Sequence, residues 1–181
     1  MAKAPHASRP VWFNAGLVLL AAALFGLLVL PRLTPDPIVG KQARDFVLPR
    51  LDPARGLSGE KVRLSGLEGK AVILDFWASW CMPCRAQAPV VDAVAKAQGP
   101  RGLMALGVVS GDTPEDAAAF LASHPVGYGS VVDEQGEVSR AFGVQGLPTL
   151  VALDKTGAVV ARRSGFVSEK ELTGIAEAAL H

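Results

Sequence analysis

Cysteine and histidine are scarce in this sequence, and their scarcity excludes several kinds of site. Only two cysteines occur among the 181 residues, which is too few for the disulfide framework of a small secreted domain. The three histidines are dispersed along the chain, so a structural zinc site with four ligands is not expected. Arg85 directly follows the second cysteine, which excludes the C-x-x-C-H motif of covalent haem attachment.

Long runs of like charge are also absent, and the overall charge is close to neutral. The 18 Lys and Arg residues are balanced by 17 Asp and Glu residues, which gives a formal net charge of +1. This balance provides no basic groove, so we expect no nucleic-acid partner. Hydrophobic residues make up 50% of the chain, which is enough to build a globular core.

Charged side chains are missing altogether from residues 11–30, which read VWFNAGLVLLAAALFGLLVL. A helix of about twenty residues is roughly 30 Å long, which matches the hydrocarbon core of a bilayer. We therefore predict a single transmembrane anchor at residues 11–30, after an N-terminal tail at residues 1–10. A cleaved signal peptide is the alternative, but its apolar region is shorter and ends in a small-residue cleavage site, which this run lacks.

The rest of the chain is predicted to form a linker and one α/β domain. Residues 31–38, PRLTPDPI, contain three prolines and predict a stiff linker that is neither helix nor sheet. In the domain, residues 39–181, strands are predicted at 45–48, 61–64, 71–77, 103–109, 130–132, 149–154 and 158–163. Helices are predicted at 86–98, 113–123, 137–142 and after Ser168, with Glu171 as the capping-box partner of Ser168. This alternation predicts a mixed sheet with helices on its faces.

The two cysteines form a C-x-x-C motif, which indicates redox chemistry. Cys81 follows a buried strand and begins a helix, so its sulfur faces free N–H groups that stabilise a thiolate. Cys84 lies one turn further and can close a disulfide with Cys81, whereas a purely structural disulfide across so short a loop would stabilise little. We therefore predict that Cys81 is the exposed nucleophile and Cys84 the buried resolving thiol. We expect no metal and no cofactor besides this redox-active disulfide.

Two further residues are unusual for their positions. Asp75 interrupts the apolar run AVILDFW six residues before Cys81, and burial would raise the pKa of its carboxyl. We predict that it accepts the proton of Cys84, although a strand residue on a solvated face is the alternative. Pro148 precedes an apolar strand, where its missing N–H is awkward. The local sequence favours an ordinary trans turn, but a cis Leu147–Pro148 bond would expose backbone groups to an extended substrate segment.

Taken together, these residues resemble the thioredoxin superfamily over roughly residues 39–180. Trp80-Cys81-Met82-Pro83-Cys84 resembles its W-C-x-P-C active site. Asp75, Pro148 and Pro89 match its buried acid, its cis-proline and the proline of its active-site helix. The resemblance implies a thioredoxin-like fold, a cis Leu147–Pro148 bond and substrate binding at these two residues. We further expect Trp80 and Met82 to form an apolar rim that meets the substrate.

Within the superfamily, the chain resembles the membrane-tethered TlpA/ResA/CcmG branch. The likeness lies in the apolar N-terminal segment, the opening Gly40–Phe46, the lead-in Phe76–Trp80 and the long section between residues 103 and 146. It implies a single-pass protein of the bacterial cell membrane, with its C-terminal domain in the periplasm or outside. Such proteins reduce disulfides in apocytochromes c or oxidase subunits, with electrons from a membrane thiol donor. Gln87 departs from the glutamate that many members carry at this position.

The expected activity is therefore protein-disulfide reduction, and two alternatives stay open. The same cysteine pair would serve an oxidant or isomerase if its reduction potential were higher, and a few side chains suffice for such a change. Two thiolates also suit Cu(I), so a copper-binding chaperone is the alternative from another class. The sequence offers this chaperone no suitably placed cluster of His or Met residues.

Overall fold

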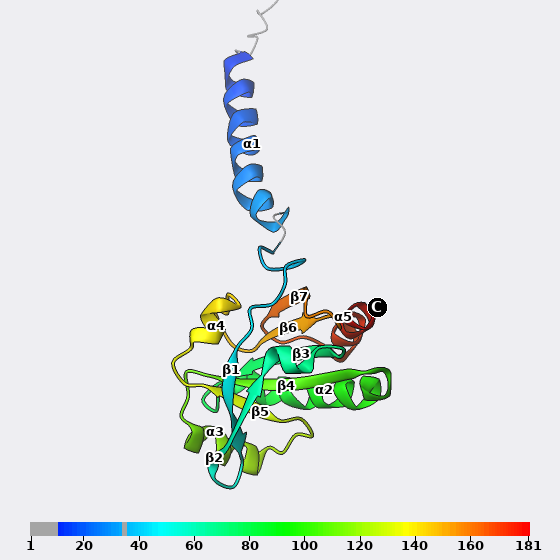
Figure 1. The fold of residues 1–181 in the computed structure, drawn as a ribbon. Coiled ribbons are helices and arrows are strands. Elements are labelled where there is room, and N and C mark those ends of the chain that lie inside the picture. The colour runs from blue at the N-terminus through cyan, green and yellow to red at the C-terminus, as the bar shows by residue number, and fades with distance from the viewer. Residues whose placement is uncertain (1–10, 34–35) are drawn as a thin grey trace, which may run out of the picture. The chain divides into compact units, whose positions relative to one another are not determined.

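The computed structural model describes residues 11–33 and 36–181 (Figure 1). The predicted tail, residues 1–10, and residues 34–35 of the predicted linker lie outside the described residues. The chain divides into two compact units, Met1–Asp36 and Pro37–His181.

The first unit contains the helix α1, Val11–Leu33. Its described apolar side chains are exposed, with Leu17 at 68% and Leu27 at 73% exposure. The helix continues through Pro31, so the prediction of a non-helical linker from residue 31 is wrong for its first three residues. Pro31 has a φ compatible with a helix but removes one i→i−4 hydrogen bond, and the helix ends two residues later. Among the residues whose side chains are described, no helix is both long and apolar enough to cross a membrane.

The second unit is built on a seven-stranded mixed sheet with the order β2-β1-β5-β4-β3-β6-β7. The strands are β1 Val47–Asp52, β2 Gly56–Arg63, β3 Ala71–Trp77, β4 Leu103–Ser110, β5 Ser130–Asp133, β6 Thr149–Leu153 and β7 Val159–Ser164. The helices are α2 Met82–Gln98, α3 Pro114–Ser123, α4 Glu137–Ala141 and α5 Glu169–Leu180. β4 pairs in parallel with β3 and β5, and the remaining pairs are antiparallel. This arrangement confirms the predicted thioredoxin-like α/β fold.

The central strand β3 positions the site because it contributes to the core on both faces of the sheet. All seven of its residues are buried, as the apolar run predicted. Successive side chains of a strand point to opposite faces. Val72, Leu74 and Phe76 pack on the α4 face, whereas Ala71 and Ile73 pack against α2 and α5. In Figure 1, α2 and α5 lie beside the central strands on the same side of the sheet.

Two predicted details are wrong. The bounds of the strands predicted at 45–48 and 61–64 differ, because β1 and β2 form a longer hairpin in which Asp52 pairs with Gly56 across the turn. The predicted capping box of α5 is half formed. The Ser168 hydroxyl accepts a hydrogen bond from the Glu171 N–H at 3.3 Å, but the Glu171 carboxylate instead accepts one from Arg163 of β7 at 3.1 Å.

Candidate active site

The two cysteines form a disulfide at the junction of β3 and α2. The Sγ–Sγ distance is 1.99 Å, and the Cα atoms are 5.3 Å apart. Cys81 is the N-cap of α2, and its sulfur accepts a hydrogen bond from the Cys84 N–H at 3.3 Å. Pro83 occupies the first turn of α2, where its missing N–H costs nothing. The sulfur of Cys81 therefore faces the helix N-terminus, as the sequence predicted.

The predicted difference in exposure between the cysteines is wrong for this disulfide. Cys81 is 3% exposed and Cys84 is 2% exposed, because both pack into one cluster with Trp77 and residues of α3. The flanking positions are open instead. Trp80 is 63% exposed and Met82 is 68% exposed, so the apolar side chains on either side of Cys81 in the sequence are open to solvent.

A short loop between β4 and α3 holds the residues that lead to Cys81. The Ser79 N–H donates a hydrogen bond to Oδ2 of Asp112 at 2.6 Å, and Trp80 Nε1 donates one to the Gly111 carbonyl at 3.4 Å. The other oxygen of Asp112 accepts a hydrogen bond from the Thr113 N–H at 2.9 Å. Asp112 thus ties the active-site loop to the start of α3. The sequence indicated only the helix cap here, so this role of Asp112 was missed.

Asp75 lies on the α2 face of β3, between the core under α2 and the disulfide cluster. It is 1% exposed, which excludes the predicted alternative of a solvated face. Its face neighbours on the strand are Ile73, which packs with α2, and Trp77, which packs with the cysteines. Burial raises the pKa of Asp75 to about 6, although a hydrogen bond from Tyr128 acts in the opposite direction.

Tyr128 is a second polar residue of this region that the sequence analysis missed. Its hydroxyl donates a hydrogen bond to Oδ2 of Asp75 at 2.8 Å. Oδ1 of Asp75 and the hydroxyl of Ser130 are buried and have no hydrogen-bond partner among the described residues. The only available signal was that Tyr128 is the single tyrosine of the chain.

The Leu147–Pro148 peptide bond is cis, as the resemblance implied. Thr149 pairs with Phe76 in the β3–β6 register, so Pro148 comes beside Trp77 at the end of β3 that leads to Cys81. Leu147 packs against the cluster that contains both cysteines. The predicted substrate-binding residues therefore lie at the same end of the sheet as the disulfide.

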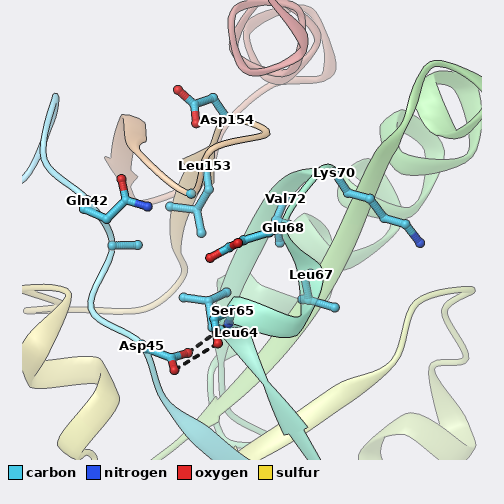
Figure 2. A pocket seen from close by; sticks show the side chains of 12 residues that line it. Gln42, Asp45, Leu64, Ser65, Leu67, Glu68, Lys70, Val72, Leu153 and Asp154 are labelled. Carbon is cyan, nitrogen blue, oxygen red and sulfur yellow. Dashed lines mark hydrogen bonds between the residues drawn. The ribbon is translucent and has the colours of Figure 1, made fainter.

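A pocket of about 150 Å³ lies at the opposite end of the sheet (Figure 2). Val72, near the start of β3, and Leu153, at the end of β6, line it. In Figure 2, the Asp45 carboxylate accepts hydrogen bonds from the N–H and the hydroxyl of Ser65, at 2.9 and 3.1 Å. Because this pocket is remote from Cys81, it is not part of the redox site.

The sequence model of the AhpC/TSA family matches residues 39–162. The chain belongs to the AhpC/TSA family. Its relatives include the thiol-disulfide oxidoreductase ResA of Geobacillus thermodenitrificans, which is 31% identical over 134 residues and 74% of each chain.

Solved structures of thiol–disulfide exchange proteins are also similar to this chain. A structure of a putative thiol:disulfide interchange protein DsbE from Chlorobium tepidum is 32% identical, with a TM-score of 0.71, and the match covers 82% of this chain and 100% of that one. The exposed lipoprotein thioredoxin of Streptococcus pneumoniae is also 32% identical, with a TM-score of 0.64, over 75% of this chain and 99% of that one. Family, fold and disulfide together make the chain a thiol–disulfide oxidoreductase of ResA/DsbE type.

In this AhpC/TSA protein, Gln87 connects the active-site helix to the segment before α5. It is fully buried, and both ends of its amide bind Val167. Oε1 accepts a hydrogen bond from the Val167 N–H at 2.7 Å, and Nε2 donates one to the Val167 carbonyl at 3.2 Å. The amide suits this position because it offers both an acceptor and a donor, whereas a carboxylate offers only acceptors.

Proposed function

We propose that the protein is a membrane-tethered, extracytoplasmic reductase of protein disulfides. The observation that carries this proposal is the Cys81–Cys84 disulfide at the N-terminus of α2, beside the Leu147–Pro148 turn. The helix N-terminus stabilises the thiolate of Cys81, which is the species that attacks a disulfide. No cofactor besides the cysteine pair is needed for this chemistry.

The catalytic cycle has two exchange steps. The Cys81 thiolate attacks one sulfur of a substrate disulfide, forming a mixed disulfide and releasing the other substrate sulfur as a thiolate. Cys84 then loses its proton and attacks the Cys81 sulfur, which closes the intramolecular disulfide and releases the second substrate sulfur. Two electrons have passed to the substrate, and a membrane thiol donor must restore the two thiols.

Asp75 is the proposed acceptor of the Cys84 proton. Its buried position on the α2 face and a pKa of about 6 support this role, because the carboxylate is mostly ionised at neutral pH yet more basic than an exposed one. The free Oδ1 offers lone pairs for the proton.

The substrate is proposed to bind along the cis turn. The Pro148 carbonyl accepts a hydrogen bond from the Gly165 N–H at 2.8 Å, so an extended segment would pair with the backbone of Leu147. The exposed side chains of Trp80 and Met82 would contact its apolar residues. Disulfides of apocytochromes c or oxidase subunits are the proposed substrates.

The proposed anchor is residues 11–30, which carry no charge and lie in α1. With a rise of about 1.5 Å per residue, a helix of this length matches a bilayer core. An extracytoplasmic location is supported by the relative from Streptococcus pneumoniae, which is named an exposed lipoprotein. Carbonate-washed membranes should therefore retain the full chain and lose a chain that begins at Pro37, the first residue of the second compact unit.

The main test is substrate trapping with Cys84→Ser in the native membrane. Without the resolving thiol, the mixed disulfide at Cys81 persists, so partners should appear as adducts that dithiothreitol releases. Cys81→Ser is the matched control and should trap nothing. If Cys84→Ser forms no adduct, or Cys81→Ser forms the same ones, the proposed division of roles is wrong.

The direction of electron flow needs its own measurement. For a reductant, equilibration of the cysteine pair with glutathione should give a reduction potential closer to the roughly −270 mV of thioredoxin than to the roughly −120 mV of DsbA. A value near that of DsbA would make the protein an oxidant.

A further inference from the structure

The hydrogen bond between Tyr128 and Asp75 is unexplained by the roles described so far. Tyr128 lies in the segment between α3 and β5, 53 residues from Asp75 in the sequence. Its ring packs against the core under α2 and α5, and its hydroxyl reaches Oδ2 of the carboxyl. The two carboxyl oxygens of Asp75 are therefore inequivalent, since Oδ2 is bonded and Oδ1 has no partner among the described residues.

Helix α2 fixes the position of Tyr128 through the preceding residue. The Gly127 N–H donates a hydrogen bond to Oδ1 of Asp92 at 2.9 Å, and Oδ2 of Asp92 pairs with Lys96 at 2.6 Å. A Cβ on Gly127 would lie 2.8 Å from Oδ1 of Asp92, so a larger residue here would displace the Asp92 side chain. The helix that carries the cysteine pair thus also holds the tyrosine that binds the acid.

Tyr128 acts only as a donor in this contact. Burial, and then the neighbouring Asp75 carboxylate, raise the pKa of Tyr128 above its usual range, so the phenol keeps its proton. A phenol that stays protonated donates one hydrogen bond to the carboxylate and stabilises its ionised form.

We propose that Tyr128 is a positioning residue that holds Oδ2 of Asp75 and thereby presents Oδ1 to the thiol of Cys84. This inference rests on the proposed function, in which Asp75 takes the Cys84 proton as the Cys84 sulfur attacks Cys81. The proton moves to Oδ1, the new bond joins the two cysteine sulfurs, and the substrate sulfur leaves.

Two ion pairs lie on the elements of this face. Among the described residues they are Asp92 with Lys96 on α2, and Arg163 of β7 with Glu171 of α5. The neighbours of Asp75 in the sheet, Gly107 of β4 and Leu150 of β6, carry no charge. Tyr128 is therefore the contact whose removal changes the surroundings of Asp75 most directly.

The test compares pH profiles of single-turnover disulfide reduction by the purified, reduced full chain. In wild type, one limb of the profile, meaning one range of pH over which the rate changes, reports the ionisation of the Cys84 proton acceptor. Asp75→Asn should remove this limb. Tyr128→Phe keeps the ring and deletes the hydroxyl, so this limb should move to higher pH by about one unit. In the double variant, Tyr128→Phe should have no further effect on the profile.

Ser130→Ala is the matched control, because it deletes a neighbouring buried hydroxyl that does not bond Asp75. It should leave the limb in place. A carbon-13 titration of the Asp75 carboxyl in the oxidised full chain should show the same upward shift in Tyr128→Phe alone.

The outcomes distinguish failure of the positioning role of Tyr128 from failure of the proposed role of Asp75. If Asp75→Asn removes the limb but Tyr128→Phe leaves both the limb and the titration unmoved, the positioning role is refuted and the proposed function stands. An equal shift in Ser130→Ala also refutes it. If Asp75→Asn keeps the limb, the proton acceptor is another group, and the proposed role of Asp75 fails together with this inference.

Discussion

Replacement of Asp75 by asparagine should change the stability of the protein in a pH-dependent way, with the variant gaining on wild type as pH rises. The pKa of Asp75 is about 6 in the fold against 3.8 for the free side chain, chiefly because burial disfavours the charge. This difference corresponds to about 3 kcal/mol of unfolding free energy. Between pH 3.8 and 6 the folded state keeps a proton that the unfolded chain releases, so wild-type stability falls as pH rises through this window and levels off above it.

Asparagine cannot ionise, so it avoids this loss. Its carbonyl can still accept the hydrogen bond of Tyr128, but its amide N–H groups find no assured partner, which costs about 1–3 kcal/mol at every pH. The diagnostic quantity is therefore the change with pH. From pH 4 to pH 8, the unfolding free energy of Asp75→Asn should increase by about 2–3 kcal/mol relative to wild type.

Urea unfolding of the oxidised protein at several pH values measures this change, with the fluorescence of buried Trp77 as the signal. Asp45→Asn is the control, because the backbone N–H of Ser65 lowers the pKa of this exposed carboxyl. The stability of that variant relative to wild type should fall as pH rises to about 4, which is the opposite sign, and should then stay nearly constant up to pH 8. A stability difference between Asp75→Asn and wild type that is constant from pH 4 to pH 8 would refute the reasoning.

Three further variants test the surrounding structure. Asp112→Ala should lower the unfolding free energy by about 1–3 kcal/mol and slow insulin reduction, because the Ser79 N–H loses its partner next to the disulfide; unchanged activity would contradict this. Gln87→Ala should cost about 2–4 kcal/mol in urea unfolding, because it leaves a cavity and unpairs Val167. Ser168→Ala should cost about 1 kcal/mol of stability without altering turnover.

Local patterns predicted much of the fold and the core of the site. The run at 71–77 gave the central strand because burial on both faces demands an uninterrupted apolar sequence. The position of Cys81 at a helix start followed from the C-x-P-C spacing. Asp75 was noticed because a charge in such a run is costly. The boundaries of β1 were missed because its pairing with β2 depends on a turn that the local pattern does not reveal.

The missed contacts join residues that are far apart in the sequence. Asp112 binds Ser79 across 33 residues, and Gln87 binds Val167 across 80. No periodicity or motif connects such pairs, since the sheet topology alone brings them together. The near-equal burial of Cys81 and Cys84 was missed for the same reason, because α3, which packs against the disulfide, is distant in sequence.

The stability cost of Asp75 and its strength as a base have one physical origin. An ordinary thiol has a pKa of about 8.5, so transfer of its proton to an ordinary carboxylate is opposed by a pKa difference of more than about four units. Raising the pKa of Asp75 to about 6 reduces this opposition by about 3 kcal/mol, the same quantity by which burial destabilises the ionised fold at neutral pH. The two effects cannot be separated. A variant that relieves the burial of the charge must gain stability and weaken the base together. A substitution near Asp75 that slows resolution by weakening the base should therefore also stabilise the protein at pH 8. The same substitution should leave the stability unchanged near pH 3.8.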